Sequence, residues 1–461
     1  MKIMVLKLFC VMIVGLLLVP TSSASGFDEW NEGDEKRILG HSFDEEYWTA
    51  SVTNESENGS ATFSVFYVNS SDVQVFLVAL NNVIGKEGKK GVLPYQLFGM
   101  HYYTPKGREV FIGAIFAFLM AYNDTNGNNI QDPGNEDVYY IIPFGLDDEN
   151  GSYAPQINVH NVEKLEEGHY RFGITYTNLF AKIVDGNDPW SFWVSVALPV
   201  LHARFSELTV MYDVTIDDET GEVKAETYYT IGQVEVIRIW GAPAEPRDIL
   251  NENWGISAVH YVSVFASWYK ITSQETGHEI NTGISAPAEN ISIKVGDKDD
   301  RAFDIGYRGT YDLLNESSSP HTTVAEDKNA YNILLQAKPA DLILVGWQLG
   351  FSAGLFSLLS YALSENIQDQ YSSPKDLRHK WWLNYAHTAR LWYAVSFPGW
   401  RGYRVEHDPT YTAYFGASSS TPPDEDDDGR PCGLGSLLII GAVCIPSIPV
   451  ISKRTRRKKK L

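Results

Sequence analysis

The chain has 461 residues, 58 acidic against 37 basic residues, and a net charge of −21 at pH 7. Two basic residues lie near the N-terminus and seven in the last nine positions, so the chain between them has a net charge near −30. This charge disfavours binding to nucleic acid and to anionic lipid. No cysteine lies between residues 27 and 431, which excludes a fold held by disulfides.

The first 25 residues are predicted to be a secretory signal peptide. Lys2 and Lys7 precede the uncharged apolar run Leu8–Pro20, and small residues follow at 21–26. This order matches the n-region, h-region and cleavage site of a signal peptide. An uncleaved anchor helix is the alternative.

Residues 27–241 are predicted to form an antiparallel β-sandwich domain. Runs rich in β-branched and aromatic residues alternate with turn residues, and no long helical period interrupts them. The clearest hairpin signal is Asp217–Gly221, which lies between two such runs. The predicted strands cover residues 61–79, 110–122, 138–143, 169–183, 190–200, 208–216 and 223–236.

The stretch Asp124–Glu136, between two of these predicted strands, has the spacing of a calcium loop. Acidic or amide side chains occupy positions 1, 3, 5 and 9, and position 7 would contribute a backbone carbonyl. Calcium prefers six to eight such oxygens. A plain polar turn is the alternative, because Asn, Asp and Gly favour turns anyway. The predicted ligands are Asp124, Asn126, Asn128, Ile130, Asp132 and Glu136.

This loop resembles those of dockerins, thrombospondin type 3 repeats and staphylococcal B repeats, which stiffen extracellular modules. The resemblance implies calcium as a cofactor and implies no fold for the rest of the chain. Two positions depart from the pattern. Position 6 is Asn129 where glycine is usual, and position 12 is Asn135, with the acid Glu136 one place later.

Asn-X-Ser/Thr sequons are dense, and in an exported chain they are acceptors for glycans. Asn123 is also a sequon, but a glycan there would compete with a tight cation site. The predicted glycosylation sites are Asn54, Asn58, Asn69, Asn150, Asn290 and Asn315.

Residues 247–415 are predicted to form a second β-rich domain that also contains helices. The Pro-rich stretch 242–247 looks like the boundary between the two domains. Residues 375–396 carry basic residues among Trp and Tyr, as an amphipathic helix would. Such a helix packs on its own domain or lies on the membrane surface.

Three hypotheses fit the uncharged segment Leu342–Ser364. It could cross a membrane. Alternatively, Gly350-Phe-Ser352-Ala-Gly354 matches the nucleophile elbow of serine hydrolases, with Ser352 as the nucleophile. The third and favoured hypothesis is a buried segment of the core, with glycines spaced four apart on one face.

The C-terminus is predicted to anchor the chain in the membrane. Residues 416–431 form an acidic linker, residues 432–452 a transmembrane helix, and residues 453–461 a basic cytoplasmic tail. Because positive residues remain in the cytoplasm, residues 27–415 are expected outside the cell.

The C-terminus has a linker, then Cys432-Gly433, an apolar span and a basic tail. This arrangement resembles the tripartite sorting tails of archaeal surface proteins, the Cys-Gly-Pro type. In this chain Leu434 replaces the proline. The resemblance implies an exported surface protein, and in that group the cysteine is suspected to carry a lipid. For Cys432 the alternative is an unmodified thiol.

These features predict a single-pass, calcium-stabilised extracellular surface protein that serves envelope structure, adhesion or ligand binding. Its expected partners are the membrane, through the C-terminal helix, and other surface proteins or glycans, but not nucleic acid. A non-enzymatic role is preferred. The alternatives are a tethered hydrolase that uses Ser352 and a carbohydrate-binding protein that uses its Trp-rich second half.

Overall fold

The described part of the chain is built from antiparallel strands. The computed structural model describes residues 44–56, 59–70, 72–84, 91–103, 109–129, 136–142, 145–146, 156–185, 201–232, 234–238, 254–266, 271–276, 286–287, 291–295, 301–307, 310–315, 322–329, 331–335, 372, 388–400, 403–407 and 409–415. Every strand pairing within these residues is antiparallel, which confirms the predicted mainly β, antiparallel fold.

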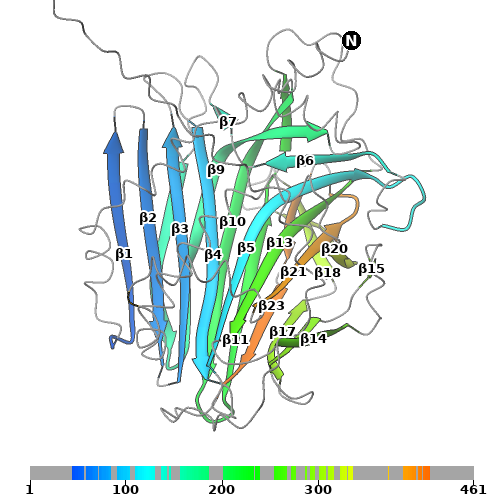
Figure 1. The fold of residues 1–461 in the computed structure, drawn as a ribbon. Coiled ribbons are helices and arrows are strands. Elements are labelled where there is room, and N and C mark those ends of the chain that lie inside the picture. Colours follow the sequence, from blue (N-terminus) through cyan, green and yellow to red (C-terminus); the bar gives the residue numbers. More distant parts are fainter. Residues whose placement is uncertain are drawn as a thin grey trace, which may run out of the picture. The chain divides into compact units, whose positions relative to one another are not determined.

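One layer of strands contains the first five strands and four from the second half of the chain (Figure 1). In order of pairing it consists of β1 (Tyr47–Ser56), β2 (Gly59–Asn69), β3 (Val73–Ile84), β4 (Gly91–Tyr103), β5 (Glu109–Asn123), β13 (Trp254–Ala266), β21 (Thr388–Phe397), β20 (Tyr331–Leu335) and β15 (Ala286–Pro287). The short strand β7 (Gly145–Leu146) pairs with the start of β4.

The second layer mixes strands from both halves of the chain in the same way. Its order is β8 (Gln156–Glu166), β9 (His169–Asp185), β10 (Leu201–Asp217), β11 (Glu222–Ile231), β23 (Pro409–Tyr414), β17 (Arg301–Tyr307), β16 (Ile291–Val295) and β14 (Ile271–Thr276). β22 (Arg404–His407) also pairs with β11, and β18 (Thr310–Asn315) and β19 (Thr322–Asn329) follow it. β12 (Val234–Arg238) pairs with β10.

The strand β6 (Val138–Ile142) connects the two layers. One edge of β6 pairs with the end of β5, and its other edge pairs with the end of β9. Because β5 belongs to the first layer and β9 to the second, the sheet turns from one layer into the other at β6. The polar loop that precedes β6 therefore lies next to this junction.

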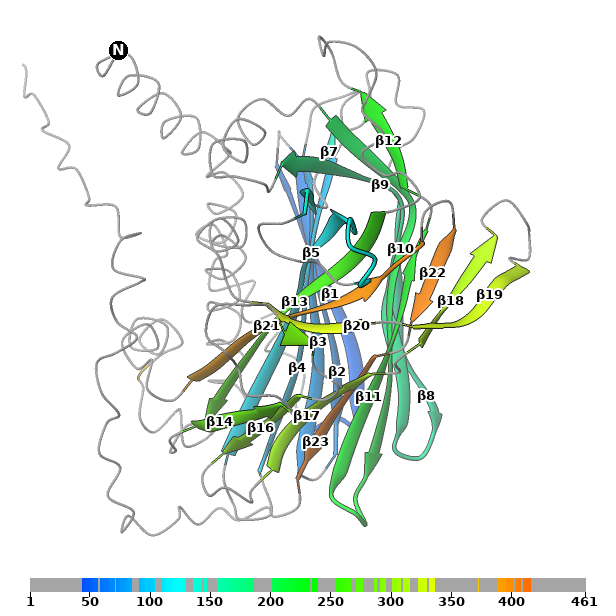
Figure 2. The same ribbon diagram turned by 90° about the vertical axis from the view of Figure 1, so that its right-hand side faces the viewer.

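Figure 2 shows the strands of the two layers from the side. Aromatic side chains from the two layers contact one another between them. Phe98 on β4 stacks on Tyr212 of β10, with ring centroids 4.5 Å apart, and also contacts Tyr411 of β23. Phe66 on β2 stacks on Phe172 of β9. Aromatic pairs of this kind contribute stability beyond the area that they bury.

A buried hydrogen-bonded chain also joins the layers. The Tyr176 hydroxyl on β9 donates to Oδ1 of Asn81 on β3 and accepts from Nε2 of Gln96 on β4. All three side chains are buried. A buried polar group is costly unless it is hydrogen-bonded, so this contact fixes how the two layers align.

The strands β2–β5 are buried on both faces. Val68 and Val75 face the second layer, and Val65, Phe76 and Phe111 on the opposite face are also 0% exposed. This explains why the apolar runs here are nearly continuous, since a strand covered on only one face would alternate apolar and polar residues. β11 does alternate between buried and partly exposed positions.

The predicted hairpin at Asp217–Gly221 is confirmed. It joins β10 to β11, which pair in register from Leu208↔Ile231 to Asp217↔Glu222. The Asp217 carboxylate accepts the backbone N–H groups of Glu219 and Thr220, and Gly221 has a φ of 68°. An Asp that bonds the backbone ahead of it, followed by a left-handed glycine, is what such a turn requires.

The sequence suggested a boundary at residues 242–247 between domains 27–241 and 247–415. Residues 242–247 lie outside the described residues, but described strands from the two sides pair with one another. β13 and β21 extend the layer beyond β5, and β23 pairs with β11, so both expected domains share the same layers. All described residues belong to one compact unit. The physical reason is that β5 and β11 would each expose an unpaired edge without strands from the second half.

The prediction of a helix over residues 375–396 is wrong for the part that the structure describes. Residues 388–397 form β21, which pairs with β13 over its whole length and with β20 at its end. Two flanking strands satisfy the backbone groups of this segment, and that pairing outweighs its helical pattern of aromatic and basic residues.

Among the residues that the structure describes, no helix is long and apolar enough to cross a membrane. Several predicted segments lie outside the described residues: the signal peptide 1–25, the segment Leu342–Ser364, the linker 416–431, the anchor 432–452 and the tail 453–461. The hypotheses about them remain predictions.

Candidate functional site: the loop between β5 and β6

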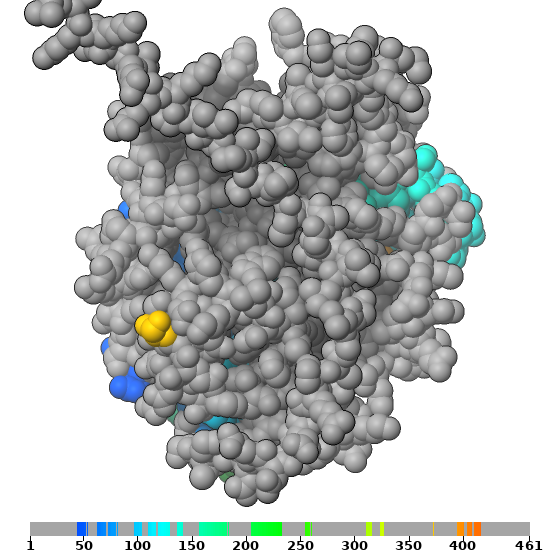
Figure 3. Space-filling model, in the orientation of Figure 1, coloured from blue at the N-terminus to red at the C-terminus, as the bar shows by residue number. Residues whose placement is uncertain are grey.

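The predicted calcium loop follows β5 directly. Residues 124–129 and Glu136 are described, whereas Ile130 and Asp132 lie outside the described residues. The base of the loop is closed by the register pair Tyr122↔Val138 and by a hydrogen bond from Asn123 N to Asp137 O of 2.9 Å. Cyan atoms of this part of the chain reach the surface on the right of Figure 3.

The backbone of the loop turns around the carboxylate of Asp124. Oδ1 of Asp124 accepts the N–H of Asn128 at 3.1 Å, and Oδ2 accepts the N–H of Asn129 at 2.9 Å. The Asn126 side-chain oxygen also accepts the N–H of Asn128. These contacts hold the side-chain oxygens of positions 1 and 3 close to one another, and a carboxylate oxygen with one hydrogen bond retains a lone pair for a cation.

Position 6 of the loop has the left-handed conformation. Asn129 has a φ of 64°, a conformation for which calcium loops commonly use glycine. Asparagine reaches this region more easily than other residues with a side chain. The departure from the usual glycine is therefore compatible with the turn. Gly127 is also left-handed, with a φ of 70°.

Glu136 returns to the start of the loop. The residue is only 7% exposed, and its Oε1 accepts the N–H of Thr125 at 3.2 Å. Glu136 and Asp124 also both act on the phenol of Tyr122. Burial raises the pKa of Tyr122 most, a hydrogen bond with Ser396 lowers it, and the charges of Asp124 and Glu136 raise it further. The two carboxylates are thus brought to the same end of the loop.

Tyr122 attaches the loop to the sheet. Its hydroxyl donates to the carbonyl oxygen of Asn129 at 2.9 Å, and its ring is fully buried. The ring lies over Gly255 of β13, its register partner, where a Cβ atom would be 2.3 Å from the ring. A glycine at this position is required because only its missing side chain leaves room for the tyrosine.

Replacement of Gly255 by alanine is expected to displace Tyr122 and destabilise the protein by about 1–3 kcal/mol, because a packed ring must move to accept one methyl group. Urea unfolding measures this change. Tyr122→Phe is the companion variant, since it keeps the ring, removes one hydrogen bond and should cost only about 1 kcal/mol. An unchanged unfolding midpoint for Gly255→Ala would show that Tyr122 does not depend on this glycine.

The described loop residues fit a calcium site in part. Asp124, Asn126 and Glu136 supply oxygen ligands of the type that calcium prefers. In the part of the chain that the structure describes, no three His, Cys, Asp or Glu side chains group as a metal site. The predicted set also relies on amide and carbonyl oxygens and on Ile130 and Asp132, which the structure does not describe.

Two buried histidines form polar contacts that the sequence did not reveal. His101 lies between Gln74 and Glu109, with Nδ1 2.6 Å from Gln74 Oε1 and Nε2 3.0 Å from Glu109 Oε1. His260 contacts the Tyr229 hydroxyl at 2.9 Å. These residues come from separate strands, so no spacing along the sequence links them. Their burial assigns them to the core.

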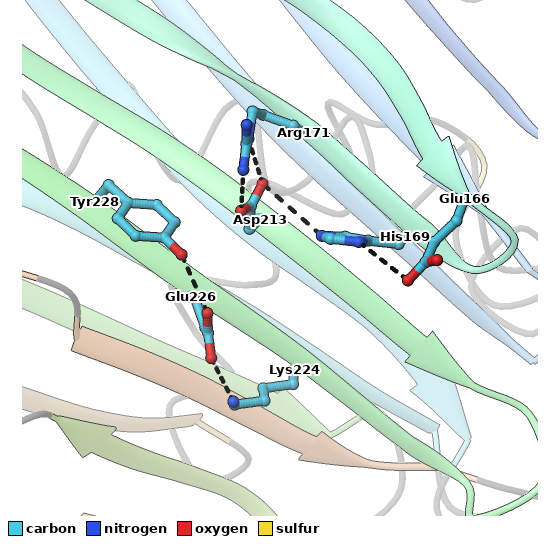
Figure 4. Close-up of polar contacts among 7 residues, drawn as sticks. All are labelled: Glu166, His169, Arg171, Asp213, Lys224, Glu226 and Tyr228. Atoms are coloured by element: carbon cyan, nitrogen blue, oxygen red, sulfur yellow. Dashed lines mark hydrogen bonds and ion pairs between the residues drawn. The ribbon is translucent and has the colours of Figure 1, made fainter.

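A polar row on the outer face of β9–β11 also escaped the sequence analysis (Figure 4). Arg171 makes two hydrogen bonds to Asp213, of 2.7 and 2.6 Å. Lys224 and Tyr228 both contact Glu226. The available signal was the alternation of these strands, which places every second residue on the outer face.

The other predicted sites are distributed over the chain. Asn54 lies in β1, Asn69 ends β2, and Asn315 is exposed at the end of β18. Asn58, Asn150, Asn290 and the alternative nucleophile Ser352 lie outside the described residues. The described structure thus gathers only residues of the calcium loop into one site.

Comparison with known proteins gives no relative for this chain. No family model, no curated protein and no solved structure matches it.

Proposed function

We propose that this chain is an exported surface protein with a calcium-stabilised β-rich body and a single C-terminal membrane anchor. The body lies outside the cell and serves envelope structure, adhesion or ligand binding, with other surface proteins or glycans as partners. Calcium is supported chiefly by the loop after β5. Its backbone turns around Asp124, and position 6 has the left-handed conformation that calcium loops use.

The position of the loop in the fold suggests a structural role for calcium. The loop connects β5 to β6, and β6 pairs with both layers. A cation supplies positive charge that offsets the repulsion between Asp124 and Glu136. The oxygens of Asp124, Asn126 and Glu136 would hold the ion, and the hydrogen bond from Tyr122 would transmit that order to β5. Calcium would therefore stiffen the connection between the layers.

Export and anchoring are supported by the sequence. The signal-like residues 1–25, the apolar span 432–452 and the basic tail 453–461 occur in the order expected of a single-pass protein with its body outside. The sequons agree with this location, since glycans are added to exported chains.

The calcium hypothesis predicts that calcium raises the thermal midpoint of the full-length chain and that a chelator reverses the rise. A ligand that binds only the folded state adds about 2.7 kcal/mol of stability at about 100 times its Kd. Asp124→Asn should abolish most of this response, because an amide is a weaker calcium ligand than a carboxylate. Differential scanning calorimetry with calcium and with chelator measures it.

Asp217→Asn is the matched control. Asp217 also accepts two backbone N–H groups in a tight turn, and these bonds, that of Thr220 first, hold its pKa below the ordinary value. No cation is predicted to bind at Asp217, so the Asp217→Asn protein should keep the full calcium-dependent rise in thermal midpoint. A midpoint that calcium leaves unchanged in the wild-type protein would reduce the loop to a polar turn and remove calcium from the proposal.

A further inference from the structure

The outer face of β9, β10 and β11 carries a row of paired charged side chains. Arg171, Asp213 and Glu226 are register partners on the three neighbouring strands. All three point away from the core, because residues next to them along the chain are buried between the layers: Phe172 beside Arg171, Tyr212 and Val214 beside Asp213, and Ala225 beside Glu226. Figure 4 views this face directly.

The charged groups of this row are held in place. Both oxygens of Asp213 accept from Arg171, and the Asp213 side chain is only 8% exposed. Glu226 accepts from Lys224 Nζ and, at 3.2 Å, from the Tyr228 hydroxyl. Because these side chains are already ordered, a ligand would lose little conformational entropy in binding them.

Tyr228 lies next to this row with an exposed ring. It is 39% exposed, whereas most of the aromatic side chains of the described core are buried. In Figure 4 the ring lies along its strand and its hydroxyl points toward Glu226. The result is one exposed aromatic ring with a hydrogen-bonded carboxylate at its edge.

We propose that the outer face of β9–β11 binds an uncharged glycan, with Tyr228 against the sugar ring and Glu226 and Arg171 at its hydroxyl groups. A pyranose ring has an apolar C–H face that fits an aromatic ring, and its hydroxyls both donate and accept. The face offers carboxylate acceptors and ammonium and guanidinium donors. Arg171 and Lys224 oppose Asp213 and Glu226 on this face, and Glu166 beside His169 adds one further negative charge, so the face does not favour an anionic polymer.

This inference gives the proposed surface role a ligand class and places the binding site on β9–β11 rather than in the Trp-rich second half. It does not depend on calcium. An Asp124→Asn protein should therefore bind the glycan as the wild-type protein does, and a failure of the calcium hypothesis would leave this one standing.

Affinity electrophoresis tests the proposal. The full-length chain is run through gels that contain hydroxyethylcellulose, xyloglucan or mannan as neutral glycans, or polygalacturonate as an anionic one. At least one neutral glycan should retard the protein. Tyr228→Ala should weaken that binding by about tenfold, because it removes the stacking surface. Glu226→Gln, which keeps the shape of the side chain, should weaken it by a smaller factor.

Tyr47→Ala is the control, because Tyr47 on β1 has almost the same exposure, 38%, and lies outside the row. It should be retarded like the wild-type protein, and the thermal midpoints of all variants verify that they are folded. The proposal is overturned if no neutral glycan retards the chain or if folded Tyr228→Ala and Glu226→Gln are both retarded as strongly as the wild type. Retardation by polygalacturonate alone that salt abolishes would also overturn it.

Discussion

Replacement of Phe98 by alanine is expected to lower the free energy of unfolding by about 3–5 kcal/mol, the usual cost of removing a buried aromatic ring. Phe98 is 1% exposed and contacts Tyr212 of β10 and Tyr411 of β23. It therefore lies between strands that the sequence assigned to two separate domains. The loss should appear in a single unfolding transition, because all described strands belong to one unit.

Urea unfolding followed by near-ultraviolet and far-ultraviolet circular dichroism measures this effect. Leu165→Ala is the control, because Leu165 on β8 is 39% exposed and its loss should change stability by no more than about 0.5 kcal/mol. Two transitions, of which Phe98→Ala shifts only one, would contradict the single unit and restore the two-domain hypothesis.

Acid is expected to destabilise the protein through His260. The pKa of His260 is lowered from 6.5 to about 3, chiefly by burial; a hydrogen bond with the Ala258 backbone opposes the shift, and the charge of His407 adds to it. The unfolded chain then binds a proton near pH 6.5, whereas the folded chain does not. The stability from neutral His260 is complete above the unfolded pKa and is lost as the pH falls toward the folded one.

When the pH falls from about 7 to about 4.5, His260 alone should lower the free energy of unfolding by about 2–3 kcal/mol, because one pKa unit corresponds to about 1.4 kcal/mol. Urea unfolding at both pH values measures the loss. Gln at position 260 in the His260→Gln variant cannot titrate but retains hydrogen-bonding groups for Tyr229. The acid-induced loss of unfolding free energy should therefore be smaller in this variant than in the wild-type protein by about 2–3 kcal/mol. Equal losses would mean that His260 is protonated equally in the folded and unfolded states.

Several features of the fold were predictable because they depend on a few neighbouring residues. The hairpin at Asp217–Gly221 needs only an Asp that bonds the next backbone groups and a glycine that accepts positive φ. The turn of the loop around Asp124 depends in the same way on residues within five positions. The runs of β-branched and aromatic residues also marked most of the described strands up to β11.

Sequence reasoning failed for residues 388–397 because their aromatic and basic pattern favours an amphipathic helix. Only the neighbours β13 and β20, which lie far away along the chain, decide that this segment is a strand. The pairing of strands from the two sides of the suggested boundary near residue 242 was not predictable for the same reason. A Pro-rich stretch shows where regular structure ends, and it carries no information about which strands pair across it.

By itself, the sequence determined the β-rich character of the chain, its turns and the spacing of the loop after β5, because backbone preference and short-range hydrogen bonds are local. The tertiary structure decided the rest. It placed Tyr122 over Gly255, buried His260 beside Tyr229, and aligned Arg171, Asp213 and Glu226 on one face. These contacts join residues on different strands, and strand order and register follow from burying apolar surface over the whole chain rather than from any local pattern.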